Sequence, residues 1–165
     1  MIFMIKSVNI PKERIAVLIG EYGSSKKTIE KETHTKILIE DEVIIEGESL
    51  DVLTAENIVK AIGRGFSPEN ALKLADEEIL LDIIHLPKTD LERLRSRIIG
   101  AKGKARRTLE MLTDTNISVY GKTVSIIGKY ENVFPAREAV EKLIKGFSHK
   151  SVYAFLEGKH QNRKN

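Results

Sequence analysis

The sequence predicts an α+β protein made of two tandem copies of one small domain, each with a three-stranded antiparallel sheet packed by helices on one face. Two observations support this fold class. The chain repeats itself at an offset of 80 residues, and both copies pass through helical and strand periodicity in the same order. We expect the first copy, with a junction helix, at residues 1–78 and the second, with a C-terminal helix, at residues 79–165.

The repeat keeps its register over most of each half. The segment LIGEYG at 18–23 returns as IIGAKG at 98–103, and THTKILI at 33–39 returns as TDTNISV at 113–119. Further along, at an offset of 81, GFS at 65–67 returns as GFS at 146–148. The extra residue falls in a turn between strands, which is typical of a duplicated domain.

Each copy has the order strand, helix, helix, strand, strand, helix. In the second copy Pro87 ends an apolar strand, and Thr89-x-x-Glu92 predicts a capping box that opens the first helix. The expected elements are a strand at 79–86, helices ending at Gly100 and starting after Gly103, strands at 117–120 and 124–126, and a helix from about 132–135 to Gly146.

The first copy follows the same plan. Ser67 and Pro68 predict the capped start of the junction helix, which is expected to run to Glu77. Its counterpart at the C-terminus is expected at 148–156. The remaining elements are an N-terminal strand, helices before Gly20 and after Gly23, strands at 36–40 and 43–46, and a helix at 50–63.

Composition indicates a folded chain without thiol chemistry. Hydrophobic residues make up 41% and charged residues 31% of the 165 residues, unlike the composition of disordered chains. The absence of cysteine excludes disulfides and thiolate metal sites. No export signal or membrane-spanning run is recognised, so a cytoplasmic protein with no membrane partner is expected.

The two halves of the chain differ in net charge. Residues 1–80 carry 10 Lys and Arg against 15 Asp and Glu, net −5, whereas residues 81–165 carry 17 against 9, net +8. A basic half favours a polyanion such as nucleic acid, and an acidic half is repelled by one and is freer to meet a protein. The alternative for the acidic half is that its charge only keeps the surface solvated.

The two G-x-x-G turns, at 20–23 and 100–103, are candidate phosphate-binding loops. Each would leave N–H groups free at the start of the following helix, where the helix dipole favours an anion. Glycine allows a sugar-phosphate backbone to come close and tolerates positive φ. A single such spacing is common in helical turns, but two at equivalent places in a repeat are a much rarer combination.

The motifs IGEYGSSK and IGAKGKAR, in this order of elements, resemble the type I KH domain over nearly the whole chain. The resemblance implies two tandem KH domains of the order β-α-α-β-β-α that bind single-stranded RNA through the G-x-x-G loop. Two divergent copies with a basic second one are similar to an archaeal ribosome-assembly family. That likeness implies binding near the 3′ end of small-subunit rRNA, with a processing endonuclease and a translation-initiation factor as further partners.

The second loop is expected to make most of the RNA contact. Seven basic residues and no acidic one lie between Arg93 and Arg107. Lys102 and Lys104 are expected at phosphates, and backbone groups of the Ser118 strand at base edges. The expected RNA-binding residues are Arg97, Ile98, Ile99, Gly100, Ala101, Lys102, Gly103, Lys104, Arg106, Arg107, Ile117, Ser118 and Val119.

The first loop departs from the family pattern. Glu21 places a negative charge where phosphate would sit, and Tyr22 replaces a basic or small residue. This loop is expected to bind RNA weakly or to serve protein contacts. Its residues are Gly20, Glu21, Tyr22, Gly23, Lys26 and Lys27.

Catalysis is not expected. The four histidines are scattered without metal-ligand spacing, and GAKGKA lacks the spacing and the Ser or Thr of a P-loop. No enzyme activity, cofactor or metal is therefore predicted. Two alternatives stay open: a KH-fold protein-interaction module that has lost RNA binding, and a general KH protein of translation control or RNA decay.

Overall fold

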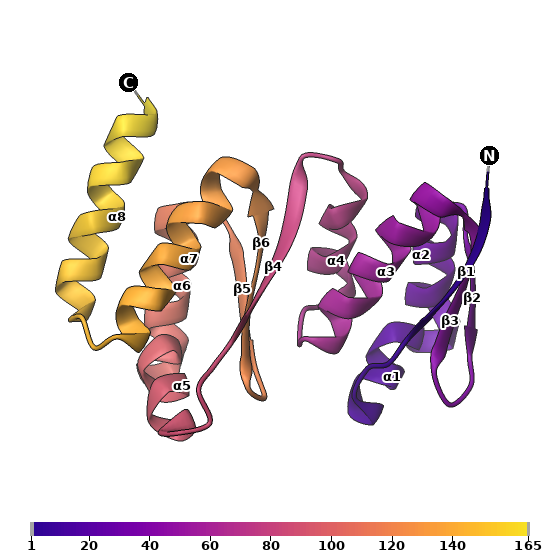
Figure 1. Ribbon diagram of the computed structural model, residues 1–165, viewed down its shortest axis with the longest axis horizontal. Helices are drawn as coiled ribbons and strands as arrows, with labels where there is room; N and C mark the ends of the chain where they lie inside the picture. The colour runs from indigo at the N-terminus through magenta and orange to yellow at the C-terminus, as the bar shows by residue number, and fades with distance from the viewer. Residues whose placement is uncertain (1, 165) are drawn as a thin grey trace. The chain divides into compact units, whose positions relative to one another are not determined.

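The computed structural model describes the backbone of residues 2–164 and the side chains of residues 2–159. The chain forms two compact units, Met1–Ile79 and Leu80–Asn165 (Figure 1). The expected boundary, between residues 78 and 79, lies one residue earlier. None of the described helices combines the length and the apolar character needed to cross a membrane.

The first unit has a three-stranded antiparallel sheet in the order β1-β3-β2, with Ile45 opposite Ile37 on one side and Lys6 on the other. Its elements are β1 (Phe3–Val8), α1 (Lys12–Ile19), the 3-10 turn η1 (Glu21–Gly23), α2 (Ser24–Thr33), β2 (Lys36–Ile39), β3 (Val43–Glu48), α3 (Ser49–Gly63), α4 (Pro68–Ala71) and η2 (Leu72–Ala75).

The second unit repeats this plan with the strand order β4-β6-β5. Its elements are β4 (Ile79–His85), α5 (Leu91–Ile99), η3 (Ala101–Gly103), α6 (Lys104–Thr113), β5 (Asn116–Tyr120), β6 (Thr123–Lys129), α7 (Tyr130–Ile144) and α8 (His149–Lys164). The prediction of an α+β chain with two three-stranded antiparallel sheets is confirmed.

The core of the second unit lies between its sheet and its helices. Alternate residues of β5 and β6 point to the same side as the apolar stripes of α5, α6 and α7, which is what strand and helix periodicity require. Leu156 of α8 also belongs to this core. Its fully buried members include Ile98, Leu109, Ile126, Leu143 and Leu156.

Helix boundaries differ from the sequence expectation at three places. Helix α5 begins at Leu91, and its N-cap Asp90 is left-handed, with φ 59° and no side-chain cap bond, so the predicted capping box at Thr89 was wrong. Helix α7 begins at Tyr130 and holds Pro135 in its interior, and α8 runs on to Lys164. The predicted start of α7, at 132–135, was too late. It followed from the preference of proline for the first turn of a helix, whereas here proline lies in the helix interior.

The junction helix was predicted correctly at its start only. Ser67 Oγ accepts a hydrogen bond from the Asn70 N–H at 3.2 Å, with Pro68 in the first turn. After Ala71 the chain tightens into the 3-10 turn η2. The expected helix to Glu77 therefore consists of two short turns.

An arginine in each unit joins the first helix of the unit to the end of the long helix that follows its sheet, α3 in the first unit and α7 in the second. Arg97 donates to the carbonyls of Leu143 at 3.3 Å and Phe147 at 2.5 Å, and Arg14 donates to those of Ile62 and Phe66, both at 2.7 Å. The carbonyls are equivalent at offset 81, but the arginines are not equivalent in the repeat. They lie about one helical turn apart on the helix face, so both can reach the same acceptors.

We expect Arg97→Met to lower the free energy of unfolding by about 1–3 kcal/mol, because it removes the arginine donor of the Phe147 carbonyl and one of the donors of the Leu143 carbonyl. Urea unfolding followed by circular dichroism measures this loss. Arg93→Met is the matched control: it lies on the same helix, its side chain is 60% exposed, and among the described residues its ion-pair partner is Asp90 at 3.6 Å. Its effect should stay within about 0.5 kcal/mol, and equal losses in the two variants would contradict the role given to Arg97.

Candidate nucleic-acid interface

The turn between α5 and α6 presents backbone N–H groups at a helix start. Gly100 closes α5 by donating to the Ser96 carbonyl at 2.8 Å, and Gly103 donates to the Gly100 carbonyl at 3.1 Å. Gly103 is the N-cap of α6 and provides no side-chain cap. The Lys104 N–H at the start of α6 donates to the Ala101 carbonyl, and no side chain caps the N–H groups of this first turn, where the helix dipole favours an anion.

Glycine at position 100 is required by both space and backbone conformation. Its φ of 76° and ψ of 174° fall in a region that is essentially restricted to glycine. A Cβ built there would lie 2.7 Å from the backbone nitrogen of Ala105 and 2.6 Å from its Cβ. The turn therefore holds α5 against the start of α6 at a separation that no side chain allows.

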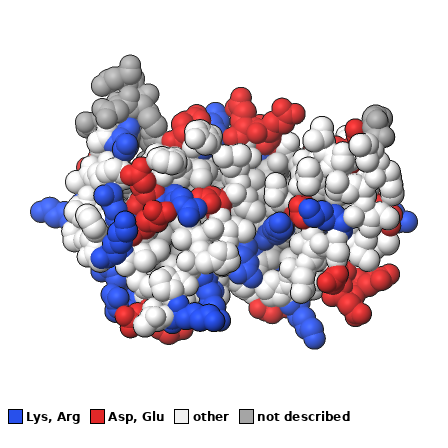
Figure 2. All heavy atoms as spheres, in the orientation of Figure 1, with Lys and Arg blue, Asp and Glu red and all other residues white. Residues whose placement is uncertain are grey.

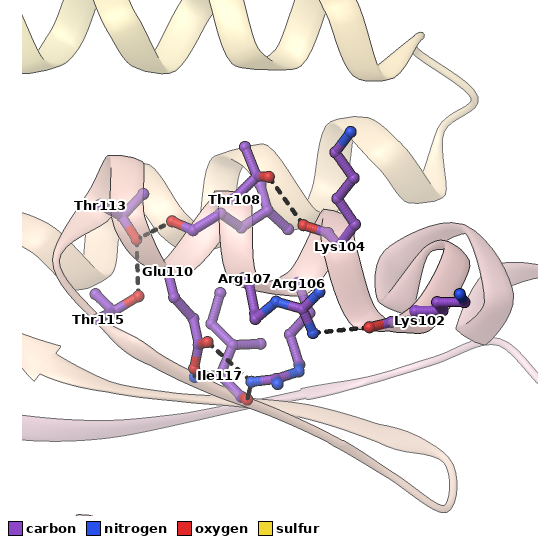
Figure 3. Close-up of polar contacts among 10 residues, drawn as sticks. Lys102, Lys104, Arg106, Arg107, Thr108, Glu110, Thr113, Thr115 and Ile117 are labelled. Carbon is purple, nitrogen blue, oxygen red and sulfur yellow. Dashed lines mark hydrogen bonds and ion pairs between the residues drawn. The ribbon is translucent and has the colours of Figure 1, made fainter.

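The loop has exposed positive charge and an internal brace. Lys102 and Lys104 are exposed, and Lys102 has a left-handed backbone with φ 54°. Arg107 donates from Nη1 to the Lys102 carbonyl at 2.7 Å (Figure 3). This bond ties the loop to α6 and so restrains the backbone of the loop.

Arg106 lies elsewhere. Its Nη1 donates to Glu110 Oε1 at 2.8 Å and to the Ile117 carbonyl at 3.3 Å. Glu110 Oε2 in turn accepts from the Ile117 N–H at 2.8 Å. Figure 3 shows these side chains reaching from α6 to the strand β5. Of the two arginines that follow the loop, Arg107 braces the loop and Arg106 sits at the strand edge.

The open edge of β5 is defined by these contacts. The N–H and carbonyl of Ile117 point to Glu110 and Arg106, away from β6. Backbone groups alternate along an antiparallel strand, so Val119 also presents its N–H and carbonyl to the edge, and Ser118, opposite Ser125, directs its own toward β6. The strand that holds Ser118 was expected to offer backbone groups to base edges, and the outward groups of this strand are those of Ile117 and Val119.

The isoleucine and valine residues among the expected RNA-binding residues differ in burial. The side chains of Ile98 and Ile117 are 0% and 3% exposed and belong to the core. Ile99 and Val119 are half-buried. Only the latter two have accessible apolar surface beside the loop, whereas Ile98 and Ile117 act by fixing its position.

The first unit keeps the same backbone with different side chains. Gly20 and Gly23 have φ of 74° and 75°, and Tyr22 at φ 55° is 92% exposed. Glu30 Oε2 accepts from the Ile37 N–H at 2.8 Å, as Glu110 does from Ile117, but its other oxygen meets Lys26 at 3.4 Å. Both units thus share the glycine turn and the bond from the glutamate to the strand, but Tyr22 stands where the second unit has the positively charged Lys102.

The surface charge around the two loops differs in the same way. Figure 2 shows Lys and Arg side chains gathered over the part of the second unit where α5 and α6 lie, and Asp and Glu side chains at the turn between β2 and β3 in the first unit. That turn is formed by Glu40, Asp41 and Glu42. Of the two loops, the second is therefore the one placed among basic side chains.

The ionisable groups with shifted pKa values lie away from both loops. Hydrogen bonds to Asp82 and then to Glu141 raise the pKa of Arg137, and burial raises the pKa of Tyr153. The described residues contain no group of three or more His, Asp or Glu side chains placed to hold a metal ion. Both shifts therefore belong to ion pairing and packing of the second unit.

Comparison with known proteins matches both units. The profile described as eukaryotic type KH domain, KH-domain type I, matches residues 78–161, and the general KH-domain profile matches residues 5–61. A KH domain-containing protein of Methanocaldococcus jannaschii is 46% identical over 97% of this chain and 76% of its own length.

Solved structures also match this chain over most of its length. Dim2p from Pyrococcus horikoshii is 48% identical with a TM-score of 0.89, over 93% of this chain and 98% of that one. A complex of aDim2p with a/eIF2alpha and rRNA from the same organism matches at 47% identity and a TM-score of 0.92, over 97% and 96%. A protein of unknown function from Aeropyrum pernix matches at 35% and 0.91, over 99% and 94%.

Proposed function

Because the chain belongs to the type I KH-domain family, with two KH domains in tandem, we propose that it binds single-stranded RNA near the 3′ end of small-subunit rRNA during ribosome assembly. It acts by binding, without catalysis or a cofactor, in the cytoplasm. The observation that carries the proposal is the α5–α6 loop, where an uncapped helix start, a glycine-only turn and the exposed Lys102 and Lys104 coincide.

The geometry supports a division of roles. Phosphates are bound by the N–H groups at the start of α6 together with Lys102 and Lys104, while Arg107 holds the loop in shape. Bases lie beside Ile99 and Val119, along the open edge of β5. Arg97, whose guanidinium caps the end of α7, serves the fold and not the ligand.

Protein partners form the second part of the proposal. The relative whose complex holds an initiation factor subunit together with rRNA supports a corresponding factor as a partner of this chain. The acidic first unit suits such a contact, because its charge disfavours RNA. A processing endonuclease rests on the family resemblance alone and remains a proposal at that level.

The proposal is tested by fluorescence anisotropy with a labelled single strand of the rRNA 3′ end and with the same strand annealed to its complement. We expect saturable binding of the single strand that weakens as salt rises, and far weaker binding of the duplex, because base pairing occupies its Watson–Crick edges and keeps its bases stacked. Equal affinity for both forms, or no binding of either, would refute the function.

A further inference from the structure

In the first unit a carboxylate on the long helix is paired with two lysines. Glu56 of α3 meets Lys6 of β1 at 3.4 Å and Lys60, one turn further along α3, at 3.7 Å. The side chain of Glu56 is only 10% exposed. Lys6 lies opposite the buried Ile45 in the sheet register, on the side that the helices cover. These contacts join the edge strand β1 to the helix that packs against it.

The second unit has an arginine in the place of that carboxylate. Arg137 of α7 donates from Nη1 to the two carboxylate oxygens of Asp82 on β4, at 2.7 and 2.9 Å. Its Nε donates to Glu141, one turn further along α7, at 2.7 Å. Here too the contacts join an edge strand to the long helix of the unit.

The two sets of three residues occupy equivalent positions in the repeat. The offset of 81 holds for the long helices, and Ile10-Pro11 returns as Leu86-Pro87, which gives an offset of 76 for the strands before them. We call them the first triad and the second triad: Lys6, Glu56 and Lys60, and Asp82, Arg137 and Glu141. The first triad reads positive, negative, positive, and the second reads negative, positive, negative. Every sign is inverted.

The apolar residues around the triads do not distinguish the two strands. Val8 of β1 and Ile84 of β4 are equivalent, and both are buried. On the helices the buried Val52 returns as the buried Val133. Cores tolerate exchanges of hydrophobic residues of similar volume. Apolar packing alone would therefore accept either strand on either sheet.

The charges would not accept such an exchange. If β1 took the place of β4 on the second sheet, Lys6 would face Arg137. If β4 took the place of β1 on the first sheet, Asp82 would face Glu56. Solvent screens Glu56 little because that side chain is nearly buried. Like charges placed together in a contact disfavour the wrong partner.

We propose that the inverted triads keep each edge strand on its own sheet, so that the two units fold in one chain without exchanging β1 and β4. Edge strands are the part of a sheet that pairs most readily with another segment, and misassembly between similar domains is a characteristic failure of tandem repeats. This role is independent of RNA binding and goes beyond the proposed function.

The test gives the two triads the same signs in two opposite ways. One variant gives the first triad the signs of the second: Lys6→Asp/Glu56→Arg/Lys60→Glu. The converse variant gives the second triad the signs of the first: Asp82→Lys/Arg137→Glu/Glu141→Lys. A third variant combines all six changes, so the triads differ in sign again. All three keep oppositely charged partners within each unit, and the first two shift the net charge in opposite directions.

A disulfide can report the exchange directly, because the chain has no cysteine of its own. Phe3 is opposite Glu48 in the native register, and Lys129 is the equivalent of Glu48 in the second unit. Cysteines that face each other on neighbouring antiparallel strands are close enough for a disulfide. With Phe3→Cys/Lys129→Cys in every chain, the bond therefore reports β1 lying on the second sheet, within one chain or between two.

Each chain is refolded from urea under oxidising conditions, and the disulfide yield is read by non-reducing electrophoresis, with protein that was never unfolded as the background. We expect the yield to rise roughly tenfold in both same-sign variants, because two like-charge contacts no longer oppose the exchange. In the six-residue variant it should return to within about threefold of the original chain. Thermal midpoints show that each variant is folded.

Two results would overturn the inference. If neither same-sign variant raises the yield, or only one does, the match between the triads does not control strand placement. If the six-residue variant gives as much disulfide as the same-sign variants, the substitutions disturb folding locally, and the sign difference between the units has no role.

Discussion

Gly100→Ala is expected to destabilise the second unit by about 2–6 kcal/mol. The backbone strain of a non-glycine residue at φ 76° and ψ 174° contributes roughly 1–3 kcal/mol. The added Cβ, 2.7 Å from the backbone nitrogen of Ala105, adds an overpacking cost of about 1–3 kcal/mol. Urea unfolding of the full chain measures the loss.

Gly23→Ala provides the comparison within the same chain. Its φ of 75° and ψ of 13° lie in the ordinary left-handed region, and the nearest atom to an added Cβ is Lys27 Cε at 3.8 Å. The expected cost is only the roughly 1–2 kcal/mol of a left-handed backbone. If Gly100→Ala cost no more than Gly23→Ala, the close approach of α5 to α6 would not be the reason for the glycine.

Lys102→Asp/Lys104→Asp is expected to weaken RNA binding by roughly 100-fold to 10,000-fold, if each lysine makes one charged contact worth about 1.5–3 kcal/mol. The slope of log affinity against log salt should also become shallower by about 1.4, or 0.7 for each lost phosphate contact on a single strand. Anisotropy titrations across a salt series measure both quantities.

A control with the same change of charge is Lys129→Asp/Lys150→Asp. Both lysines are exposed, one at the N-cap of α7 and the other in the first turn of α8. Aspartate is favourable at helix starts, so folding should not suffer. We expect a small loss of affinity from the altered net charge. Losses as large as those of the loop variant would mean that binding follows total charge and not the loop.

Much of the fold could be predicted from the sequence because the repeat and the periodicity are local signals. The glycine turns, the alternating Ile117 and Val119, and the Ser67 cap all depend on neighbours within a few residues. The start of α5 was predicted wrongly because Asp90 adopts a left-handed backbone conformation, which no local sequence pattern predicts. Sequence periodicity does not predict helix boundaries that depend on tertiary packing.

The roles of the basic residues were less predictable than their presence. Sequence spacing grouped Arg97, Arg106 and Arg107 with the lysines as one charged stretch. Their partners lie far along the chain: Arg97 reaches Phe147, and Arg106 reaches Ile117. A possible clue was Glu110, since Glu30 occupies the same place in the first copy. A carboxylate repeated beside a nucleic-acid loop indicates a positioning role.

The most direct test of the central claim, that the α5–α6 loop is the RNA clamp, is an NMR titration of the isotope-labelled chain with the single-stranded rRNA 3′ end. The account predicts that the largest shifts of backbone amide signals fall on residues 100–107 and on Ile117 and Val119. Shifts confined to the first unit, or spread over α8 with residues 100–107 unchanged, would contradict it.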